Sequence, residues 1–182
     1  MSNSEVFLGL GDATGFAYVA PEATALPAYP SASLGAGFVE IGAVGEDGLD
    51  LTLPSGETIK NWAKKAERRL STENGKIKVP FIATNKKVLE VGFGENFVNF
   101  LAATAQHGNV TSVTLSPDVS PAPKSFVFLM KDGDRLAMVG CDDGLVESVD
   151  NVTFNGNDPV TWTFTIDGTW TLMFDDGQIA SS

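Results

Sequence analysis

The chain has 182 residues, of which 43% are hydrophobic, and its formal net charge is -11 at pH 7. A chain of this length can bury about two-thirds of its unfolded surface in one core, so a single domain over residues 1–182 is expected. No apolar stretch approaches the roughly 20 residues that cross a bilayer, and no Lys or Arg precedes Lys60. These features exclude a membrane span and predict a soluble chain without a secretory signal. Cys141 is the only cysteine, which excludes an intramolecular disulfide.

The charges are arranged in three blocks along the chain. Residues 1–59 hold eight acidic residues and no basic one, 60–87 hold nine of the twelve basic residues, and 136–182 hold eight acidic residues and no basic one. Because tight binding to a phosphate backbone depends on clustered cations, this balance argues against a nucleic-acid-binding protein. The basic block is either a solvated face or a surface that contacts an acidic region of another subunit.

The first half of the chain predicts an arm followed by short strands. Residues 1–36 are rich in Ala, Gly and Pro and predict an extended N-terminal arm with one short strand near 16–19. FVEIGAV (38–44), LDLTL (49–53) and KIKVPFI (76–82) predict strands. WAKKAERRL (62–70) consists largely of helix formers, so its propensity favours a helix between strand-like neighbours.

A short helix is predicted after residue 84. Asn85 is placed to cap a helix that begins with KKVLEV (86–91). Val88, Leu89 and Phe93 share one apolar face of this helix, and Gly92 and Gly94 mark its end. ENFVNFLAATAQHG (95–108) either continues this helix or forms a loop.

The second half again predicts strands. They are VTSVTL (110–115), SFVFLMK (125–131), RLAMVGC (135–141) and LVESVDNVTFN (145–155), with a proline-rich loop over 116–124. About ten short strands, one or two helices and no βαβ alternation predict a mainly β protein. We expect two packed antiparallel sheets, as a sandwich or barrel, with one short flanking α-helix.

The stretch VTWTFTIDGTWTLMFDDG (160–177) alternates apolar and threonine side chains and predicts a β-hairpin. An odd-length loop over 166–168 keeps the apolar side chains together, since it pairs Phe164 with Trp170 and Trp162 with Leu172. The threonines then form a hydroxyl face, which is either solvated or covered by polar groups of a partner.

The sequence contains no pattern that predicts a catalytic, cofactor-binding or metal-ligating residue, and we expect no cofactor. GLGDATG (9–15) lacks the GxGxxG spacing of a dinucleotide loop, and the Asp-Gly turns lack the spacing of a calcium loop. His107, the only histidine, leaves a hydrolase centred on it as a minor hypothesis. The alternative function is a carbohydrate-binding β-sandwich module that uses Trp62, Trp162 and Trp170, although the predicted pairing favours core positions for the last two.

Three segments in order carry a resemblance to a known family: FVEIGAVGEDGLDLTLPSGETIKNW, KIKVPFIATNKKVLEVGFG and RLAMVGCDDGLVESVDNVTFNGNDPVTWTFTIDGTW. They resemble the major tail tube proteins of long non-contractile-tailed bacteriophages. That family typically shows an E-D-G turn, a tryptophan about fifteen residues on, a strand leading to a short helix closed by F-G, and a C-terminal pair of strands around a D-G turn. The resemblance covers residues 38–94 and 135–175.

The resemblance implies a tail-tube fold and a structural virion protein without enzymatic activity. In this family subunits form hexameric rings that stack into a tube through which phage DNA is delivered. WAKKAERRL would then be a strand, and the region from Gly42 to Trp62 would reach towards neighbouring rings. The implied inter-subunit contacts are Gly45, Glu46, Asp47, Gly48, Leu49, Asp50, Lys64, Lys65, Arg68 and Arg69.

The implied partners are further copies of the chain and the tape measure, tail terminator and tail-tip proteins, with DNA only as passing cargo in the lumen and no membrane. The implied location is the virion tail, assembled in the host bacterial cytoplasm. Acidic segments flanking a basic middle would supply complementary sides for stacking, because stacked subunits meet through two different surfaces. Unpaired sheet edges would become joints between subunits, and the threonine face would be a wet wall or an inter-subunit surface.

Overall fold

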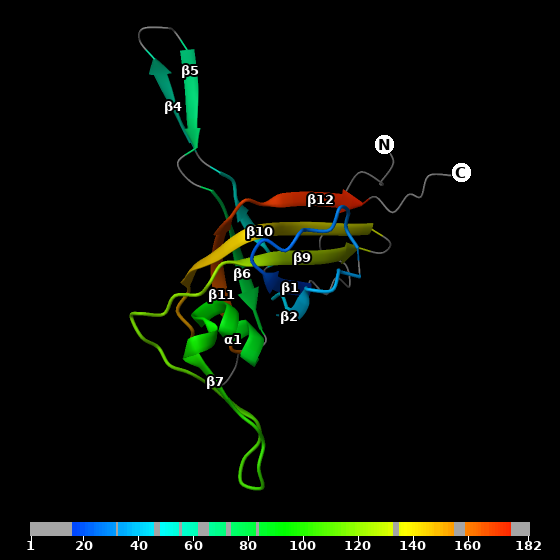
Figure 1. Cartoon of the computed structure of the whole chain (residues 1–182), viewed down its shortest axis with the longest axis vertical. Coiled ribbons are helices and arrows are strands. Elements are labelled where there is room, and N and C mark those ends of the chain that lie inside the picture. Colours follow the sequence, from blue (N-terminus) through cyan, green and yellow to red (C-terminus); the bar gives the residue numbers. More distant parts are fainter. Residues whose placement is uncertain are drawn as a thin grey trace, which may run out of the picture.

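In the computed structural model, the described residues are 16–31, 33–45, 48–54, 56–61, 66–71, 74–82, 84–132, 135–154 and 159–175. They form two packed antiparallel sheets and one α-helix, and the sheets do not close into a barrel (Figure 1). The predicted fold class, mainly β with a short flanking helix, is therefore confirmed in its sandwich form.

The first sheet, sheet A, has the strand order β2-β1-β9-β10-β12. Its strands are β1 (Phe16–Pro21), β2 (Val39–Ala43), β9 (Lys124–Asp132), the first half of β10 (Arg135–Val149) and β12 (Thr171–Asp175). Side chains of β9 alternate across the sheet: Phe126 and Phe128 face the core between the sheets, whereas Val127 and Leu129 face the other side. Both faces of β9 are covered, which explains its continuous apolar run.

The second sheet, sheet B, has the order β10-β11-β6-β3. Its other strands are β3 (Asp50–Thr52), β6 (Gly75–Phe81) and β11 (Trp162–Gly168). Strand β10 belongs to both sheets, because its register shifts between Cys141 and Gly144 and its second half then pairs with β11. Gly144 suits this bend, since a Cβ there would lie 2.5 Å from the Phe126 ring. The two strands predicted over 135–155 are thus largely one bent strand that ends at Val149.

The predicted hairpin over 160–177 is wrong in its pairing. Strands β11 and β12 pair with successive halves of β10, so that Phe164 lies opposite Val149 and Leu172 lies opposite Val139. The bend in β10 offers two consecutive antiparallel partners, and the chain crosses from sheet B to sheet A between them. Phe164 is fully buried as expected, but Leu172 is 44% exposed. Alternation within one segment cannot reveal a partner elsewhere in the chain.

Helix α1 (Lys86–Phe93) lies against both sheets and closes one end of the sandwich (Figure 1). Asn85 begins it as predicted: its Oδ1 accepts a hydrogen bond from the Val88 N–H at 2.9 Å, and its Nδ2 donates to the Ile41 carbonyl at 2.8 Å. Gly94 ends the helix with a φ of 87°. Gly92 lies within the helix, where the absence of a side chain lets the helix approach the Phe164 ring.

The segment after β1 covers the outer face of sheet A. Its apolar side chains pack with residues of β9 and β10; they are Leu26, Leu34 and Phe38 on one side and Val127, Leu129 and Met138 on the other. The short strand expected near 16–19 is β1. The rest of the expected arm, residues 1–15, lies outside the described residues.

Two hairpins extend from opposite ends of the sandwich (Figure 1). One pairs β4 (Gly56–Asn61) with β5 (Ala66–Ser71), and the other pairs β7 (Val98–Leu101) with β8 (Val110–Val113). The described part of WAKKAERRL is therefore strand, because cross-strand pairing overrides its helix propensity. The expectation for 95–108, a longer helix or a loop, is met only by the loop over 102–108. Gly94 stops the helix, and one 3-10 turn (Glu95–Phe97) leads into β7. No helix in the described part of the chain is long and apolar enough to span a membrane.

Candidate assembly surfaces

The predicted inter-subunit residues lie in two separate places. Gly45, Gly48, Leu49 and Asp50 belong to a turn that leads into β3 beside β6. The Gly48 N–H donates to the Gly45 carbonyl at 2.9 Å, and the Gly45 N–H donates to the Pro80 carbonyl at 2.7 Å. Leu49 packs against the core and Asp50 lies opposite Lys78. This turn is thus held to the body of the protein.

The other place is the hairpin β4–β5, which extends away from the sheets (Figure 1). Arg68 and Arg69 lie on β5, opposite Ile59 and Thr58 of β4. Glu46, Asp47, Lys64 and Lys65 lie outside the described residues. The described part of this projecting hairpin thus carries Arg68 and Arg69 of the basic block.

The outer face of sheet B is polar and its lysines are neutralised locally. Lys76 forms an ion pair with Glu147 at 2.8 Å, and Lys78 forms one with Asp150 at 2.7 Å, both joining β6 to the end of β10 across β11. The hydrogen bond to Asp150, aided by its charge, raises the pKa of Lys78. Thr165 lies between the two strands, opposite Lys78 on one side and Ser148 on the other. The threonine face predicted from the sequence is therefore realised on β11.

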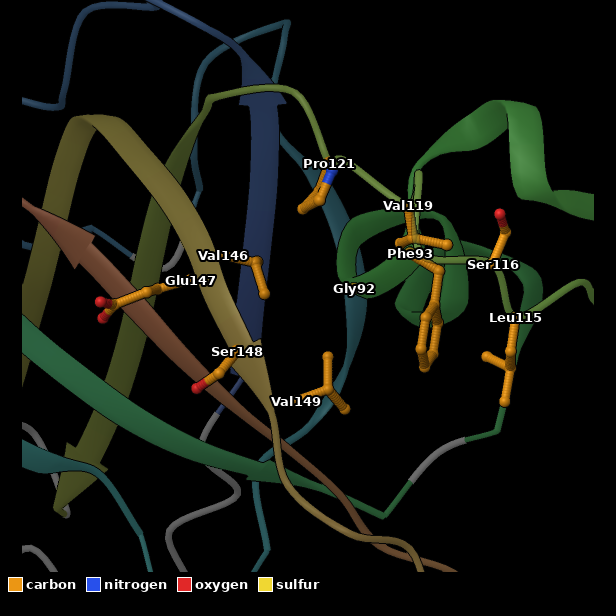
Figure 2. A pocket seen from close by; sticks show the side chains of 10 residues that line it. All are labelled: Gly92, Phe93, Leu115, Ser116, Val119, Pro121, Val146, Glu147, Ser148 and Val149. Carbon is orange, nitrogen blue, oxygen red and sulfur yellow. The ribbon is translucent and has the colours of Figure 1, made fainter.

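An apolar groove of about 210 Å³ lies between α1, the proline-rich loop and the second half of β10 (Figure 2). Its apolar lining comes from Phe93, Leu115, Val119, Pro121, Val146 and Val149. Strand β9 pairs with β10 only as far as Gly144, because Pro121 and Pro123, which precede β9, lack the N–H needed to continue the ladder. Among the described strands, none pairs with this edge of β10 beyond Gly144. No pattern in the sequence predicts this groove, because its walls come from three segments that are far apart along the chain.

Two of the three tryptophans serve the core. Trp162 packs against the core, and its Nε1 donates to the Thr84 hydroxyl at 3.0 Å. Trp170 packs on Phe128, and its Nε1 donates to the Gly75 carbonyl at 3.0 Å. These two rings form no exposed platform for a sugar, and Trp62 lies outside the described residues. Core positions predicted for Trp162 and Trp170 are confirmed in part, since both are half-buried.

The chemistry-bearing side chains of the described chain are dispersed. His107 is exposed near the tip of the hairpin β7–β8, and its Nδ1 lies 2.7 Å from the Gly108 carbonyl. Cys141 is fully buried, and burial raises the pKa of its thiol to about 12. Within the described part of the chain, no group of three or more His, Cys, Asp or Glu could hold a metal ion. The surfaces that remain for function are the projecting hairpins, the groove and the polar face of sheet B.

Comparison with known proteins agrees with the resemblance drawn from the motifs. The family model described as phage tail tube protein matches residues 3–168, a range that also includes the hairpin β7–β8, for which the motifs gave no counterpart. No curated protein matches the chain. Because the match spans most of the sequence and the fold is the expected two-sheet sandwich with one helix, this chain belongs to the phage tail tube protein family.

Proposed function

We propose that this chain is a self-assembling structural subunit whose copies form rings, six to a ring, that stack into a tube through which phage DNA is delivered. The observation that carries the proposal is the projecting hairpin β4–β5 on a chain of the tail tube family. A two-stranded ribbon has little stability alone in water, so a conspicuous one on a structural protein is best explained by a partner that covers it.

Stacking uses the opposite signs of the charge blocks. The basic hairpin of one ring, through Arg68 and Arg69 and together with Lys64 and Lys65, contacts an acidic surface of the next ring. The same contact includes Gly45, Glu46, Asp47, Gly48, Leu49 and Asp50. Exposed Asp142 belongs to the acidic C-terminal block that would receive the hairpin. Such a contact joins two different surfaces and so repeats along a tube.

The outer face of sheet B is suited to line the lumen. Its threonines keep it wet, and Lys76 and Lys78 already have carboxylates of the same chain as partners. DNA phosphates would find few uncompensated cations on such a wall, so that DNA slides rather than adheres. Lumen contact of this kind requires no base recognition and no catalysis, and we propose no enzymatic activity.

An assembled tube has two ends and a lumen, and the proposed further partners act there. They are the tape measure, tail terminator and tail-tip proteins, with DNA as passing cargo in the lumen. The proposed location is the virion tail, after assembly in the host bacterial cytoplasm.

Electron microscopy of the purified chain, combined with sedimentation velocity over a range of concentrations, tests the proposal. We expect rings or tubes that grow with concentration. Deleting residues 56–71 and joining the ends with a Gly-Ser linker should leave the circular dichroism spectrum of the β-sandwich and remove the tubes. A wild-type chain that stays monomeric at every concentration and salt would contradict the proposed function.

A further inference from the structure

The hairpin β7–β8 presents an uncharged tip to solvent, with an exposed apolar pair where its two strands end. No Asp, Glu, Lys or Arg occurs between Glu95 and Asp118, although 19% of the chain is charged. Every residue from Leu101 to Val110 is exposed. Leu101, at 59% exposure, lies directly opposite Val110, at 40%, so the two side chains form one apolar pair on one face of the ribbon.

The base of this hairpin is held firmly while its tip is not covered. Val98 is buried in a cluster with Leu89 and Phe93 of α1, and Val113, opposite Val98, packs against the same cluster. A fixed base positions the tip at a defined distance from the sandwich (Figure 1). Single exposed apolar side chains are ordinary on protein surfaces, but an apolar pair within an uncharged run on a projecting ribbon points to an interaction surface.

The groove beside β10 is complementary to such a tip. Its volume of about 210 Å³ exceeds the roughly 150 Å³ of an apolar cavity that holds a benzene-sized molecule, so one large apolar side chain has room in it. Its wall includes the unpaired edge of β10 beyond Gly144. An extended guest seated there can satisfy backbone groups of this edge as well as fill the groove.

We propose that the tip of the hairpin β7–β8 of one copy, anchored by Leu101 and Val110, docks in the groove between α1 and β10 of the next copy. The hairpin cannot fill its own groove, because Leu115, just beyond its base, lines that groove and the tip points away from it (Figures 1 and 2). Two copies that each carry a charge of -11 repel one another, and an uncharged tip approaches a second copy without adding to this repulsion. The contact joins unlike surfaces, as a ring or a stack requires.

This inference rests on the proposed function, because it names a contact within the assembly. A double variant, Leu101→Ser with Val110→Thr, tests it against a matched variant of the neighbouring cross-strand pair on the same face, Asn99→Ser with Ser112→Thr. We expect the first variant to raise the concentration needed for assembly at least tenfold and the matched variant to assemble like wild type. Since all four side chains are exposed, neither variant should change the melting temperature appreciably.

The outcomes separate the two proposals. If wild type assembles and the Leu101–Val110 variant assembles equally well, the docking inference is wrong while the proposed function stands. If wild type never assembles, the proposed function fails and the docking inference fails with it.

Cross-linking identifies the surface that receives the tip. Leu101→Cys and Val119→Cys copies, distinguished by a mass tag, are mixed and treated with a short thiol-thiol cross-linker. We expect covalent dimers containing one copy of each kind in the mixture, few dimers from either variant alone, and none from wild type, whose Cys141 is buried. Equally strong cross-linking of Leu101→Cys copies with themselves would show that the tips pair with each other and would overturn the proposed arrangement.

Discussion

At the scale of single residues, Gly92 marks a close approach between α1 and sheet B. A Cβ at this position would lie 2.5 Å from the Phe164 ring, which is itself fully buried and has no room to retreat. Gly92→Ala is therefore expected to destabilise the fold by about 1–3 kcal/mol, as overpacking of a core does. For a chain of this size that loss lowers the melting temperature by several degrees, at about 2–4 °C per kcal/mol.

The control for Gly92 is Gly108, where an added Cβ would meet no atom within 4 Å. Gly108→Ala should leave the melting temperature close to that of wild type. Equal losses for both substitutions would mean that the helix does not approach the Phe164 ring as described.

Cys141 makes a second residue-scale prediction, on pH. Burial raises the pKa of this thiol to about 12, above its value near 8.5 in an unfolded chain. As the pH rises, the thiol of the unfolded chain therefore loses its proton before the buried thiol does. The contribution of Cys141 to the free energy of unfolding is complete below pH 8.5 and is lost as the pH rises from there towards 12. Unfolding measured between pH 8 and 10.5 should show a steeper loss for wild type than for Cys141→Ala, and identical slopes would contradict the buried thiol.

At the scale of elements, Ser125 fastens the segment after β1 to sheet A. Its fully buried hydroxyl accepts a hydrogen bond from the Thr24 N–H at 3.0 Å and lies 3.1 Å from the Pro21 carbonyl and 3.2 Å from that of Asp142. Ser125→Ala leaves the Thr24 N–H with only its longer hydrogen bond to the Pro21 carbonyl, at 3.2 Å, and the lost hydrogen bond costs about 0.5–1.5 kcal/mol. We expect faster hydrogen exchange in residues 22–38 before any other part of the chain. Exchange that rises evenly over the whole chain would argue against this local anchor.

The same scale shows what the sequence could predict and what it could not. The helix was predictable because Asn85, the apolar face and Gly94 all lie within ten residues and act locally. The partners of Trp162 and Leu172 were not predictable. Trp162 lies opposite Phe81 of β6 in sheet B and Leu172 lies opposite Val139 of β10 in sheet A, and the bend at Gly144 that separates the two sheets is a tertiary feature. β5 was not predictable from propensity alone, since its helix formers are overruled by pairing with β4.

At the scale of the whole molecule, one candidate surface could be predicted from the sequence and another could not. The basic block was visible in the sequence, and the structure places Arg68 and Arg69 on a projecting hairpin. The groove could not be predicted from the sequence, because Phe93, Val119 and Val149 come together only through the packing of α1 against the end of β10. A run without charge, from Asn96 to Pro117, is a sequence signal for the second hairpin, but the sequence does not indicate that this segment projects from the sandwich.

The arrangement of charge over the whole molecule predicts how assembly responds to salt. If the basic hairpin of one copy meets the acidic block of the next, added salt screens an attraction, since the Debye length falls from about 10 Å at 0.1 M to about 3 Å at 1 M. Assembly followed by sedimentation velocity should then weaken as salt rises. Arg68→Glu should weaken it at low salt and reduce its dependence on salt, whereas Lys87→Glu on α1, which changes the net charge equally, should do neither to the same extent. Assembly that strengthens with salt would instead mean that the repulsion between chains of charge -11 outweighs any complementary contact, and the stacking contact would then have to be sought on uncharged surfaces.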